Sequence, residues 1–562
     1  MAFFNYFYDL AASTSYTTHT VGSFDANCTS GGGDFRWVPS VPNASITNIP
    51  GIRIKPTAST VGYWERVWDG PMNVGWFGCQ NTTSTPSTFA TLGVSQATLD
   101  TRYGVGFATT SDNYDTTAIR YALKMMGTLG YQSLIFEPKT YWLTRACDLP
   151  VNIVGGKTGR GMFIIDGNGA TIVKANTSQF NFFQRIPVQG TYVDINAAVE
   201  AIYIDNGFTF MNFNANGSGG VWQNSGYSFL HLAATYGSIV QNIFLTNFDT
   251  GLRLEFCMNA TVNNIFVNNA TSYSVWVRTG SWTGAALANA SSNMVQISHV
   301  RVFDTNNQIA GVALINSDTS VISQIIVEGI NGHPQYGILW DSLNSSVAPN
   351  GTIEHCHIEC SCSKAAVYVK PRSGTKIYVS DIYIQYPQNI IGLEAPNYPS
   401  SSYPIVVVDR IPYWPNGTKF LNIGTGNKWQ ISDTIINAYI TTNTQLLTPS
   451  TTASVTSASG TGSVITYNTS APHSFVAGQR VSVTGLTGGT TGGATPVLNC
   501  YNVTDQTITS VGSTTFTISG SCTGASSGTG TAVGGCYWDT TTVNGTIPTP
   551  SSRVNWTAPW GI

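Results

Sequence analysis

The sequence predicts an all-β chain built around a right-handed parallel β-helix, and three observations support this fold class. First, a short pattern of β-branched and other apolar residues recurs between residues 240 and 386. Second, its copies start 22 to 35 residues apart, a spacing typical of stacked repeats. Third, apolar residues alternate within each copy with a period of two, which indicates strands rather than helices.

The repeated segments predict one continuous core. They begin at Val240, Val262, Ile297, Ile322, Ile353 and Val379. Each of the first five is followed by a second β-rich run, and one such coil can bury its apolar face only by stacking on the next. Asn242 and Asn264 share one repeat position, which predicts a two-rung ladder of side-chain amides. A β-sandwich is the alternative, although its strands more often recur every 8–12 residues or so.

Composition excludes several classes of function. Charged residues make up 9 % of the 562-residue chain, against about 25 % in typical soluble domains. A net charge of −3 with scattered Lys and Arg gives no electrostatic case for binding nucleic acid or anionic membrane. We expect no transmembrane segment and no secretory signal, and the 10 cysteines do not suggest a disulfide framework.

Four parts are expected along the chain. Residues 1–70 carry short β-like pieces and predict a small N-terminal β region. The parallel β-helix is expected over residues 71–447, with an opening segment at 71–145. A Thr/Ser/Ala/Gly-rich stretch predicts a linker at 448–462. Alternating strands with Gly-rich turns then predict a small β-sandwich or barrel at 463–562.

One amphipathic helix is expected in the opening segment. Asp115 is a good N-cap residue, and Gly127 offers a stop. Between them apolar residues follow at helical spacing, at Ile119, Ala122, Leu123 and Met126. Such a helix would cover the open end of the coil stack, which would otherwise pair with other chains.

Motifs around this helix carry a family resemblance. The helix is preceded by Asn73, Val74, Trp76, Phe77 and Gly78 and followed by Phe136, Pro138 and Tyr141. This order resembles the opening of pectate-lyase-like β-helix proteins, and among them most of all bacteriophage tailspikes and receptor-binding proteins. Two positions depart from the usual pattern, namely Tyr114-Asp115 and Pro138-Lys139-Thr140. The resemblance covers about residues 20–145 by motif, and extends to roughly 440 by repeat architecture alone.

The resemblance implies a virion spike. The N-terminal region would bind other virion proteins, the chain would assemble as a homotrimer, and the β-helix would recognise a polysaccharide on the host cell surface. Many such proteins also cleave the glycan as hydrolases or lyases, so enzymatic activity is left open, and no cofactor is expected. Two alternatives are a free polysaccharide lyase or hydrolase of the pectinase type and a non-catalytic structural or decoration protein.

The first strand of each repeat has outward-facing residues that stack on those of the next coil, and these supply candidate catalytic residues. Glu328 and Glu359 occupy the same position in neighbouring coils, with His357 beside them. Strands stack about 4.8 Å apart, and two close carboxylates push one pKa up, which prepares an acid beside a base. The alternative is a pair of solvated glutamates on a polar face.

Aromatic and basic residues supply a candidate glycan-binding set. Trp276 and Tyr368 are outward-facing plates that can stack on sugar rings, and Arg253 and Tyr383 join them. The alternative is that Trp276 and Leu339 pack against a neighbouring subunit. Exposed ion pairs between coils are also expected, at Glu255–Arg278 and Asp341–Lys370.

A dense His/Cys stretch invites a zinc interpretation, which the strand geometry disfavours. It contains His355, Cys356, His357, Cys360 and Cys362. Their side chains alternate in direction, so the ligands would not converge, and structural zinc favours matched C-x2–4-C pairs. We therefore predict buried cysteines and no metal site. The sequence also lacks a P-loop, a dinucleotide fingerprint and an HExxH motif.

Overall fold

The computed structural model describes residues 2–538. Its gaps are 15–16, 151–161, 187–204, 218–226, 280–290, 304–307, 330–333, 343–349, 371–373, 386–388, 394–404, 410–418, 424–426, 432–446, 449–450, 474, 476, 478–479 and 492–498. The chain forms two compact units, Met1–Arg301 and Val302–Ile562, whose boundary falls inside strand β19 (Gln296–Phe303). In the described residues, no helix is both long and apolar enough to cross a membrane.

A five-stranded sheet opens the first unit. Its order is β1 (Ala2–Tyr6), β2 (His19–Ser23), β3 (Gly31–Pro42), β5 (Val61–Arg66), β4 (Arg53–Ile54). The Arg66 guanidinium is buried under this sheet, where it donates to the carbonyls of Gly51, Gly32 and Gly31 at 2.5, 2.8 and 2.7 Å. Those three bonds satisfy donors that would otherwise be costly to bury.

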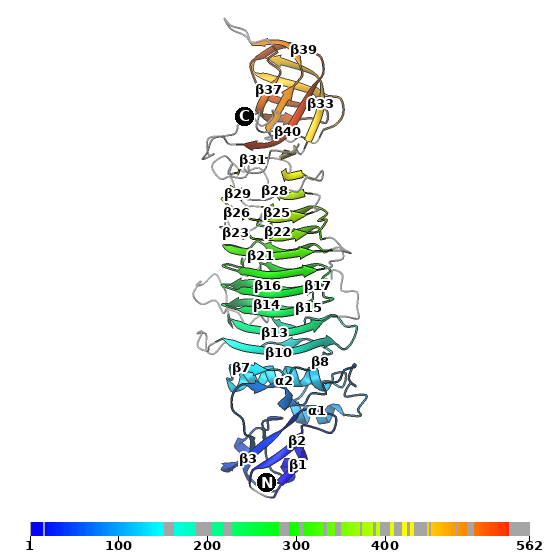
Figure 1. Cartoon of the computed structure of the whole chain (residues 1–562), viewed down its shortest axis with the longest axis vertical. Helices are drawn as coiled ribbons and strands as arrows, with labels where there is room; N and C mark the ends of the chain where they lie inside the picture. The colour runs from blue at the N-terminus through cyan, green and yellow to red at the C-terminus, as the bar shows by residue number, and fades with distance from the viewer. Residues whose placement is uncertain are drawn as a thin grey trace. The chain divides into compact units, whose positions relative to one another are not determined.

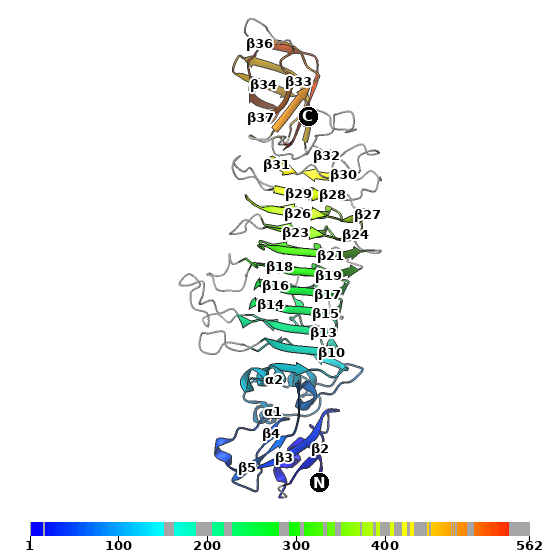
Figure 2. The same ribbon diagram turned by 60° about the vertical axis from the view of Figure 1, so that its left-hand side comes forward.

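Helices α1 (Gln96–Tyr103) and α2 (Tyr114–Leu129) follow. Figure 2 shows α2 across the end of the strand stack at β10, which confirms the expected capping helix. Its N-cap is Asn113, however, whose Oδ1 accepts from the Thr116 N–H at 2.8 Å. The helix also runs past Gly127 and ends at Leu129, where the C-cap Gly130 adopts the left-handed conformation that favours glycine.

Asp115, predicted as the N-cap, instead joins three segments. Its carboxylate accepts backbone N–H groups of Gln80 at 2.7 Å, Asn81 at 3.2 Å and Trp142 at 3.1 Å. The residue is fully buried. Burial raises the pKa of its carboxyl to about 6, although the three donors favour the charged form.

Replacing Asp115 with Asn is expected to destabilise this junction. An amide offers one acceptor oxygen and turns its NH2 toward a backbone donor, so at least one buried bond is lost. We expect a loss of about 1–3 kcal/mol in the free energy of unfolding, measured by denaturant titration. The exposed Asp69→Asn is the matched control; equal stability of the two variants would contradict the junction role.

The strands of successive coils in the first unit stack in parallel and form two sheets (Figure 1). One contains β10 (Phe163–Lys174), β13 (Phe208–Asn216), β15 (Ile239–Thr246) and β17 (Thr261–Asn268), with the short β6 (Met72–Asn73), β7 (Ser133–Ile135) and β8 (Thr140–Leu143) at its start. The other contains β9 (Cys147–Asp148), β11 (Phe183–Arg185), β14 (Ser228–Tyr236), β16 (Thr250–Met258) and β18 (Tyr273–Arg278), and β12 (Asp205–Asn206) pairs with β14. The predicted parallel β-helix is confirmed.

The coils of this unit turn at asparagines with positive φ. Asn212, Asn242 and Asn264 have φ of 63°, 56° and 54°, a region that Asn tolerates better than most side chains. Each donates to the residue one coil earlier: Asn264 to Asn242 at 2.8 Å, Asn242 to Asn212 at 2.9 Å and Asn212 to Asp166 at 2.8 Å. The amide ladder is therefore longer than the predicted two rungs.

A second ladder, absent from the sequence prediction, runs through Asn216, Asn247 and Asn269. Asn247 (φ 59°) donates to Asn216 at 3.0 Å and accepts from Asn269 at 2.8 Å. Within each ladder, every coil contributes one polar side chain at the same repeat position. They hold neighbouring coils together by side chains in addition to backbone pairing.

Two variants of Asn247 separate the ladder from its backbone conformation. Asn247→Gly keeps the left-handed φ and loses two hydrogen bonds, at a cost of about 1–3 kcal/mol. Asn247→Ala loses the same bonds and adds about 1 kcal/mol of backbone strain. Thermal unfolding should therefore rank wild type above Gly and Gly above Ala. A Gly variant as stable as wild type would show that the ladder contributes nothing.

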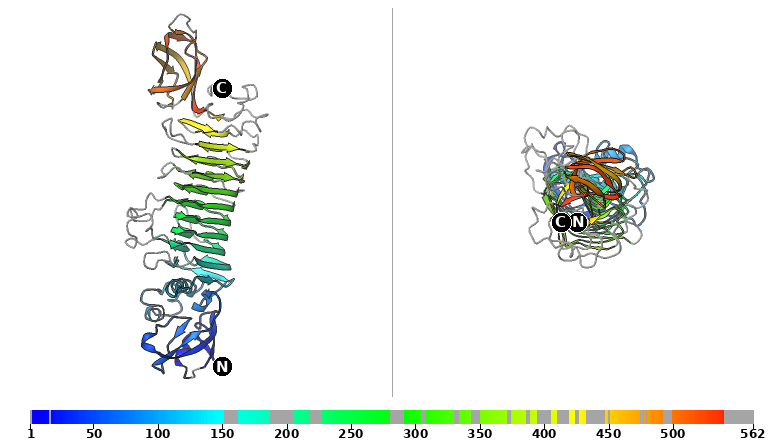
Figure 3. Two further views of the ribbon diagram at one scale, coloured as in Figure 1. Left: turned by 90° about the vertical axis from the view of Figure 1, so that its left-hand side faces the viewer. Right: turned by 90° about the horizontal axis from the view of Figure 1, so that it is seen from above.

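The second unit is also built of coils of parallel strands (Figure 3, left). One set of parallel strands contains β21 (Ser320–Glu328), β23 (Asn350–Glu354), β24 (His357–Glu359), β26 (Lys376–Ser380), β27 (Tyr383–Gln385), β29 (Ile405–Asp409) and β31 (Asn427–Ile431). The other contains β20 (Ala310–Ile315), β22 (Tyr336–Asp341), β25 (Ala365–Lys370), β28 (Asn389–Leu393), β30 (Lys419–Ile423) and β32 (Leu447–Thr448). Positive φ recurs at the corners, at Gln324, His355 and Asp381.

A closed six-stranded antiparallel barrel ends the described chain. Its strands follow one another around the circle as β33 (Thr451–Thr461), β34 (Val464–Thr469), β38 (Thr515–Ser519), β37 (Val503–Val511), β35 (Arg480–Thr484) and β40 (Gly530–Trp538). β36 (Thr487–Thr491) and β39 (Cys522–Ser527) pair beside it. Strand β33 occupies most of the segment predicted as a linker at 448–462, because Thr and Val suit strands despite the linker-like composition.

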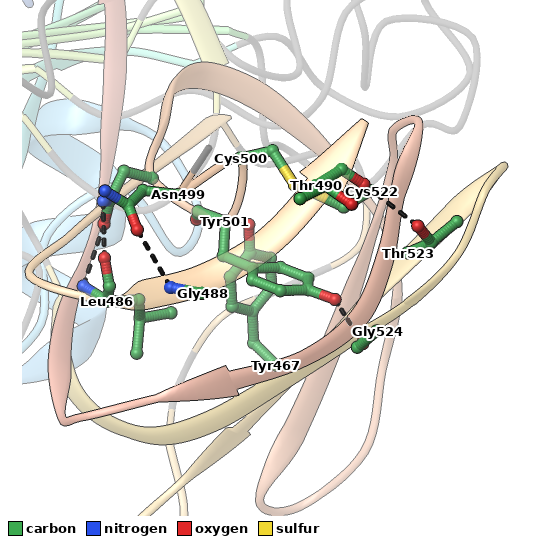
Figure 4. Close-up of a disulfide and its surroundings, with 11 residues drawn as sticks. Tyr467, Leu486, Gly488, Thr490, Asn499, Cys500, Tyr501, Cys522, Thr523 and Gly524 are labelled. Carbon is green, nitrogen blue, oxygen red and sulfur yellow. Dashed lines mark hydrogen bonds between the residues drawn. A yellow bond between two sulfur atoms is a disulfide. The ribbon is translucent and has the colours of Figure 1, made fainter. Parts of the chain in front are cut away.

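A disulfide joins the loop before β37 to β39 (Figure 4). It links Cys500 to Cys522, 22 residues apart. Next to it the hydroxyl of Tyr501 donates to the Gly524 carbonyl, and the hydroxyl of Tyr467 donates to the Tyr501 carbonyl at 2.9 Å. Among the other described cysteines, Cys28, Cys79, Cys147, Cys257, Cys356, Cys360 and Cys362 are buried free thiols.

Candidate functional site

The predicted site residues separate into groups on different strands. Glu328, His357, Glu359 and Tyr383 lie on β21, β24 and β27 of the second unit. Arg253 and Trp276 lie on β16 and β18 of the first unit, and Tyr368 lies on β25 of the second.

The Glu328 group follows the predicted register. Glu328 is paired with Glu359, and His357 with Tyr383, on successive strands. His357 Nε2 lies 3.2 Å from Glu359 Oε2, and the Tyr383 ring meets the His357 ring edge-on with centroids 4.8 Å apart. The side chains of His357 and Glu359 are 38 % and 42 % exposed, so a ligand can reach both. Their catalytic role stays a prediction.

Outward-pointing side chains of the second sheet are more covered than the alternation predicts. Leu339 is only 6 % exposed and Ala313 is fully buried, so neither forms the exposed apolar column that would favour a subunit interface. Tyr368 stands beside Leu339 in register, with its ring 4.7 Å from that of Tyr336. Asp341 and Lys370 are also in register.

A cluster of charged and aromatic side chains crosses three strands of the first unit. We call it the Glu255 cluster; its members are His231, Arg253, Glu255, Trp276 and Arg278. Parallel register aligns His231 with Arg253 and Trp276, and aligns Glu255 with Arg278. Arg253 Nε donates to Glu255 Oε1 at 2.6 Å. Arg278 Nε lies 3.7 Å from Oε1, and His231 Nε2 lies 3.6 Å from Oε2.

Glu255 is fully buried, which corrects the prediction of an exposed Glu255–Arg278 pair. Burial alone would raise the pKa of its carboxyl, but contacts with His231 and Arg253 outweigh burial and lower the pKa to about 2. Glu255 is therefore ionised at neutral pH. A buried carboxylate needs such partners, because removing one of them leaves an uncompensated charge.

His231 faces Glu255 as a neutral imidazole. Burial lowers the pKa of His231 below its usual 6.5. Asn181 Oδ1 accepts from the Ser228 N–H at 2.8 Å, so its Nδ2 is the group that lies 3.4 Å from His231 Nδ1. The amide thus donates to Nδ1, and the proton of the neutral ring sits on Nε2, toward Glu255.

The Trp276 ring contacts both arginines and a neighbouring tyrosine. The guanidinium carbons of Arg253 and Arg278 lie 5.0 and 4.6 Å from its ring centroid. Tyr273 stacks on it at 4.6 Å with an interplanar angle of 17°. Two cation–π contacts and one aromatic contact fix the plane of the indole.

The sequence prediction included Arg253 and Trp276 but missed His231. Strand β14 lacks the repeat pattern because nearly all of its side chains are buried, so no alternation marks which residues face the cluster. The paired position of His231 and Arg253 would have been visible only with the register of β14 and β16 in hand.

Neither group resembles a metal centre. Among the described residues, no three His, Cys, Asp or Glu side chains converge as metal ligands. A cavity of about 590 Å³ lies elsewhere, in the N-terminal region, with Tyr8, Lys55 and Arg102 among its lining residues.

The Glu255 cluster makes a pH-dependent prediction. Because the folded-state pKa of about 2 lies below the usual 4.5, ionised Glu255 stabilises the fold above about pH 4.5, and this stabilisation is lost as the pH falls toward 2. Glu255→Gln should be less stable than wild type at pH 7 by about 3–5 kcal/mol. That difference should shrink between pH 4.5 and 2 in denaturant unfolding.

Gln296→Ala serves as the control, because it replaces an exposed side chain that carries no ionisable group. Its stability relative to wild type should vary little over the same pH range. A constant difference between Glu255→Gln and wild type across this range would contradict the lowered pKa.

Comparisons with known proteins give matches in structure only. No protein-family model matches the sequence, and a search of curated proteins gives no significant match. Solved structures that match include the tailspike protein of Acinetobacter phage vB_ApiP_P1, at 9 % identity and a TM-score of 0.42 over 95 % of this chain and 98 % of that one.

Two further matches have similar values. A tailspike of Acinetobacter baumannii bacteriophage Fri1, described as a capsular polysaccharide depolymerase, matches at 8 % identity and a TM-score of 0.40, over 95 % of this chain and 98 % of that one. Pantoea stewartii WceF, described as a glycan biofilm modifying enzyme with a tailspike-like parallel β-helix fold, matches at 12 % identity and a TM-score of 0.37, over 88 % and 60 %. Scores this low support no functional inference.

Proposed function

We propose that this chain is a bacteriophage virion spike that recognises a polysaccharide on the host cell surface. The observation that carries the proposal is the register of the coils, which sets polar and aromatic side chains of successive strands side by side. Glu328 beside Glu359 and His357 beside Tyr383 are the clearest case. A glycan of repeating sugars suits such a surface, because stacked coils offer similar contacts at regular intervals.

Assembly follows from the family resemblance of the opening motifs. We propose a homotrimer whose N-terminal region binds other virion proteins, as part of a tail or another surface appendage. The spike would then act outside the host cell, where its glycan ligand lies.

We also propose that the spike cleaves the glycan that it binds. Glu328 and Glu359 would share general acid and base or nucleophile roles, as paired carboxylates do in glycoside hydrolysis. His357, 3.2 Å from Glu359, would orient that carboxylate, and the Tyr383 ring would hold the imidazole in place. In a lyase, Glu359 or His357 would instead remove a proton from a uronic acid.

The test is incubation of the full chain with capsular polysaccharide and lipopolysaccharide from candidate hosts. Binding, chain length and new reducing ends are measured for wild type, Glu328→Gln and Glu359→Gln. We expect binding in all three and shortening by wild type alone, with each variant at least about 100-fold slower. Shortening that survives both substitutions would place catalysis elsewhere, and binding without shortening would indicate an adhesin. Neither binding nor shortening would overturn the proposed function.

A further inference from the structure

Two buried thiols lie in contact in the turn between β24 and β25. The Sγ atoms of Cys360 and Cys362 are 3.0 Å apart, and both residues are free cysteines. A disulfide bond is about 2.05 Å long, so the two sulfur atoms are about 1 Å from bonding distance. One residue separates them in the chain, which keeps them together as long as the turn is folded.

The same structure already contains one oxidised pair. Cys500 and Cys522 form a disulfide, and such bonds persist where the surroundings are oxidising. Conditions that keep this bond also favour oxidation of a second pair of thiols, provided that the fold brings the two sulfur atoms together. Cys360 and Cys362 meet that condition.

The pair is buried beneath a turn that is itself partly exposed. Cys360 is 2 % exposed and Cys362 is fully buried. Ser361 between them is half-buried, and Ser363 and Lys364 directly after them are exposed. Local opening of such a turn is enough to admit a small oxidant, without unfolding of the coils on either side.

The two thiols differ in their readiness to react. Burial, and then the contact with Cys360, raise the pKa of the Cys362 thiol well above its usual range. Cys362 therefore stays protonated at neutral pH. Because the thiolate is the nucleophile in disulfide exchange, attack on an oxidant begins at the Cys360 sulfur, and Cys362 closes the bond.

We propose that Cys360 and Cys362 are a redox-active pair that a small-molecule disulfide, such as oxidised glutathione, converts to a labile disulfide. The Cys360 thiol loses its proton, its sulfur attacks one sulfur of the oxidant, and the released glutathione takes up that proton. The Cys362 thiol then loses its proton as its sulfur attacks the Cys360 sulfur of the mixed disulfide. The second glutathione leaves and takes up this proton, so two protein thiols are oxidised and one glutathione disulfide is reduced to two thiols.

The bond is labile because closing it deforms the turn. The Cys362 N–H donates to the Cys360 carbonyl at 2.9 Å while the sulfur atoms are still apart. Drawing them together works against this arrangement, whereas Cys500 and Cys522 are already bonded in the structure. Strain makes a disulfide easier to reduce, so the Cys360–Cys362 bond should open under milder reduction than the Cys500–Cys522 bond.

The pair directly follows the strand that carries His357 and Glu359. Movement of Cys360 toward Cys362 therefore acts on the end of β24, next to the contact between Glu359 and His357. The inference stands on the geometry of the two thiols and does not depend on the proposed function.

The test equilibrates the full chain in glutathione buffers of increasing reducing ratio, defined as the squared concentration of reduced glutathione over that of oxidised glutathione. Exchange is stopped with acid, free thiols are labelled with N-ethylmaleimide in denaturant, and mass spectrometry locates the labels. We expect Cys360 and Cys362 to lose labelling together in oxidising buffer, while the nearby Cys356 stays labelled. Half-reduction of the pair is expected at a reducing ratio at least about tenfold lower than for Cys500–Cys522.

Cys360→Ser is the matched variant, because it removes one sulfur of the pair and keeps a small side chain. Its Cys362 should form no bond with another cysteine of the chain, and half-reduction of Cys500–Cys522 should be unchanged. Wild-type Cys360 and Cys362 that are labelled in every buffer, or that carry glutathione without a bond between them, would overturn the inference. A bond from either residue to a different cysteine would do so too, as would half-reduction at the same ratio as Cys500–Cys522 or a higher one.

Discussion

Parallel backbone pairing in fixed register is the constraint on which each unit depends. Because every strand is bonded to the equivalent residues one coil away, a side chain that points inward on one coil stacks on inward side chains of its neighbours. Val240 and Val262, which are paired in register, are both buried for this reason. The same register leaves a corner in each coil where the backbone must adopt positive φ, and asparagine meets that demand while bonding to the next corner.

Register also explains how a full charge comes to be buried. An alternating strand would present Glu255 to solvent, yet the outer face of β14 and β16 is covered, and Glu255 lies among cations that the same register brings beside it. Such an arrangement stabilises only as a complete set. Stability alone does not require such a cluster, because apolar side chains of similar size often stabilise a fold equally well.

The fold was largely predictable, since period-two alternation with a regular recurrence has few other solutions. The in-register pairs Glu328–Glu359 and Arg253–Trp276 followed from spacing alone. The burial of these side chains could not be predicted in the same way, because alternation gives the direction of a side chain but not what covers it. The N-cap at Asn113, two residues before the predicted Asp115, depended on tertiary contacts of Asp115 that local sequence does not encode.

The Cys500–Cys522 bond ties part of the C-terminal barrel to a redox state. Thiols stay reduced in the cytosol of most cells, and disulfides persist in oxidising surroundings. A chain made in a reducing compartment would therefore form this bond only after leaving that compartment. Preparations with and without reductant should accordingly be regarded as two forms of the protein. They differ in whether the loop before β37 is covalently linked to β39.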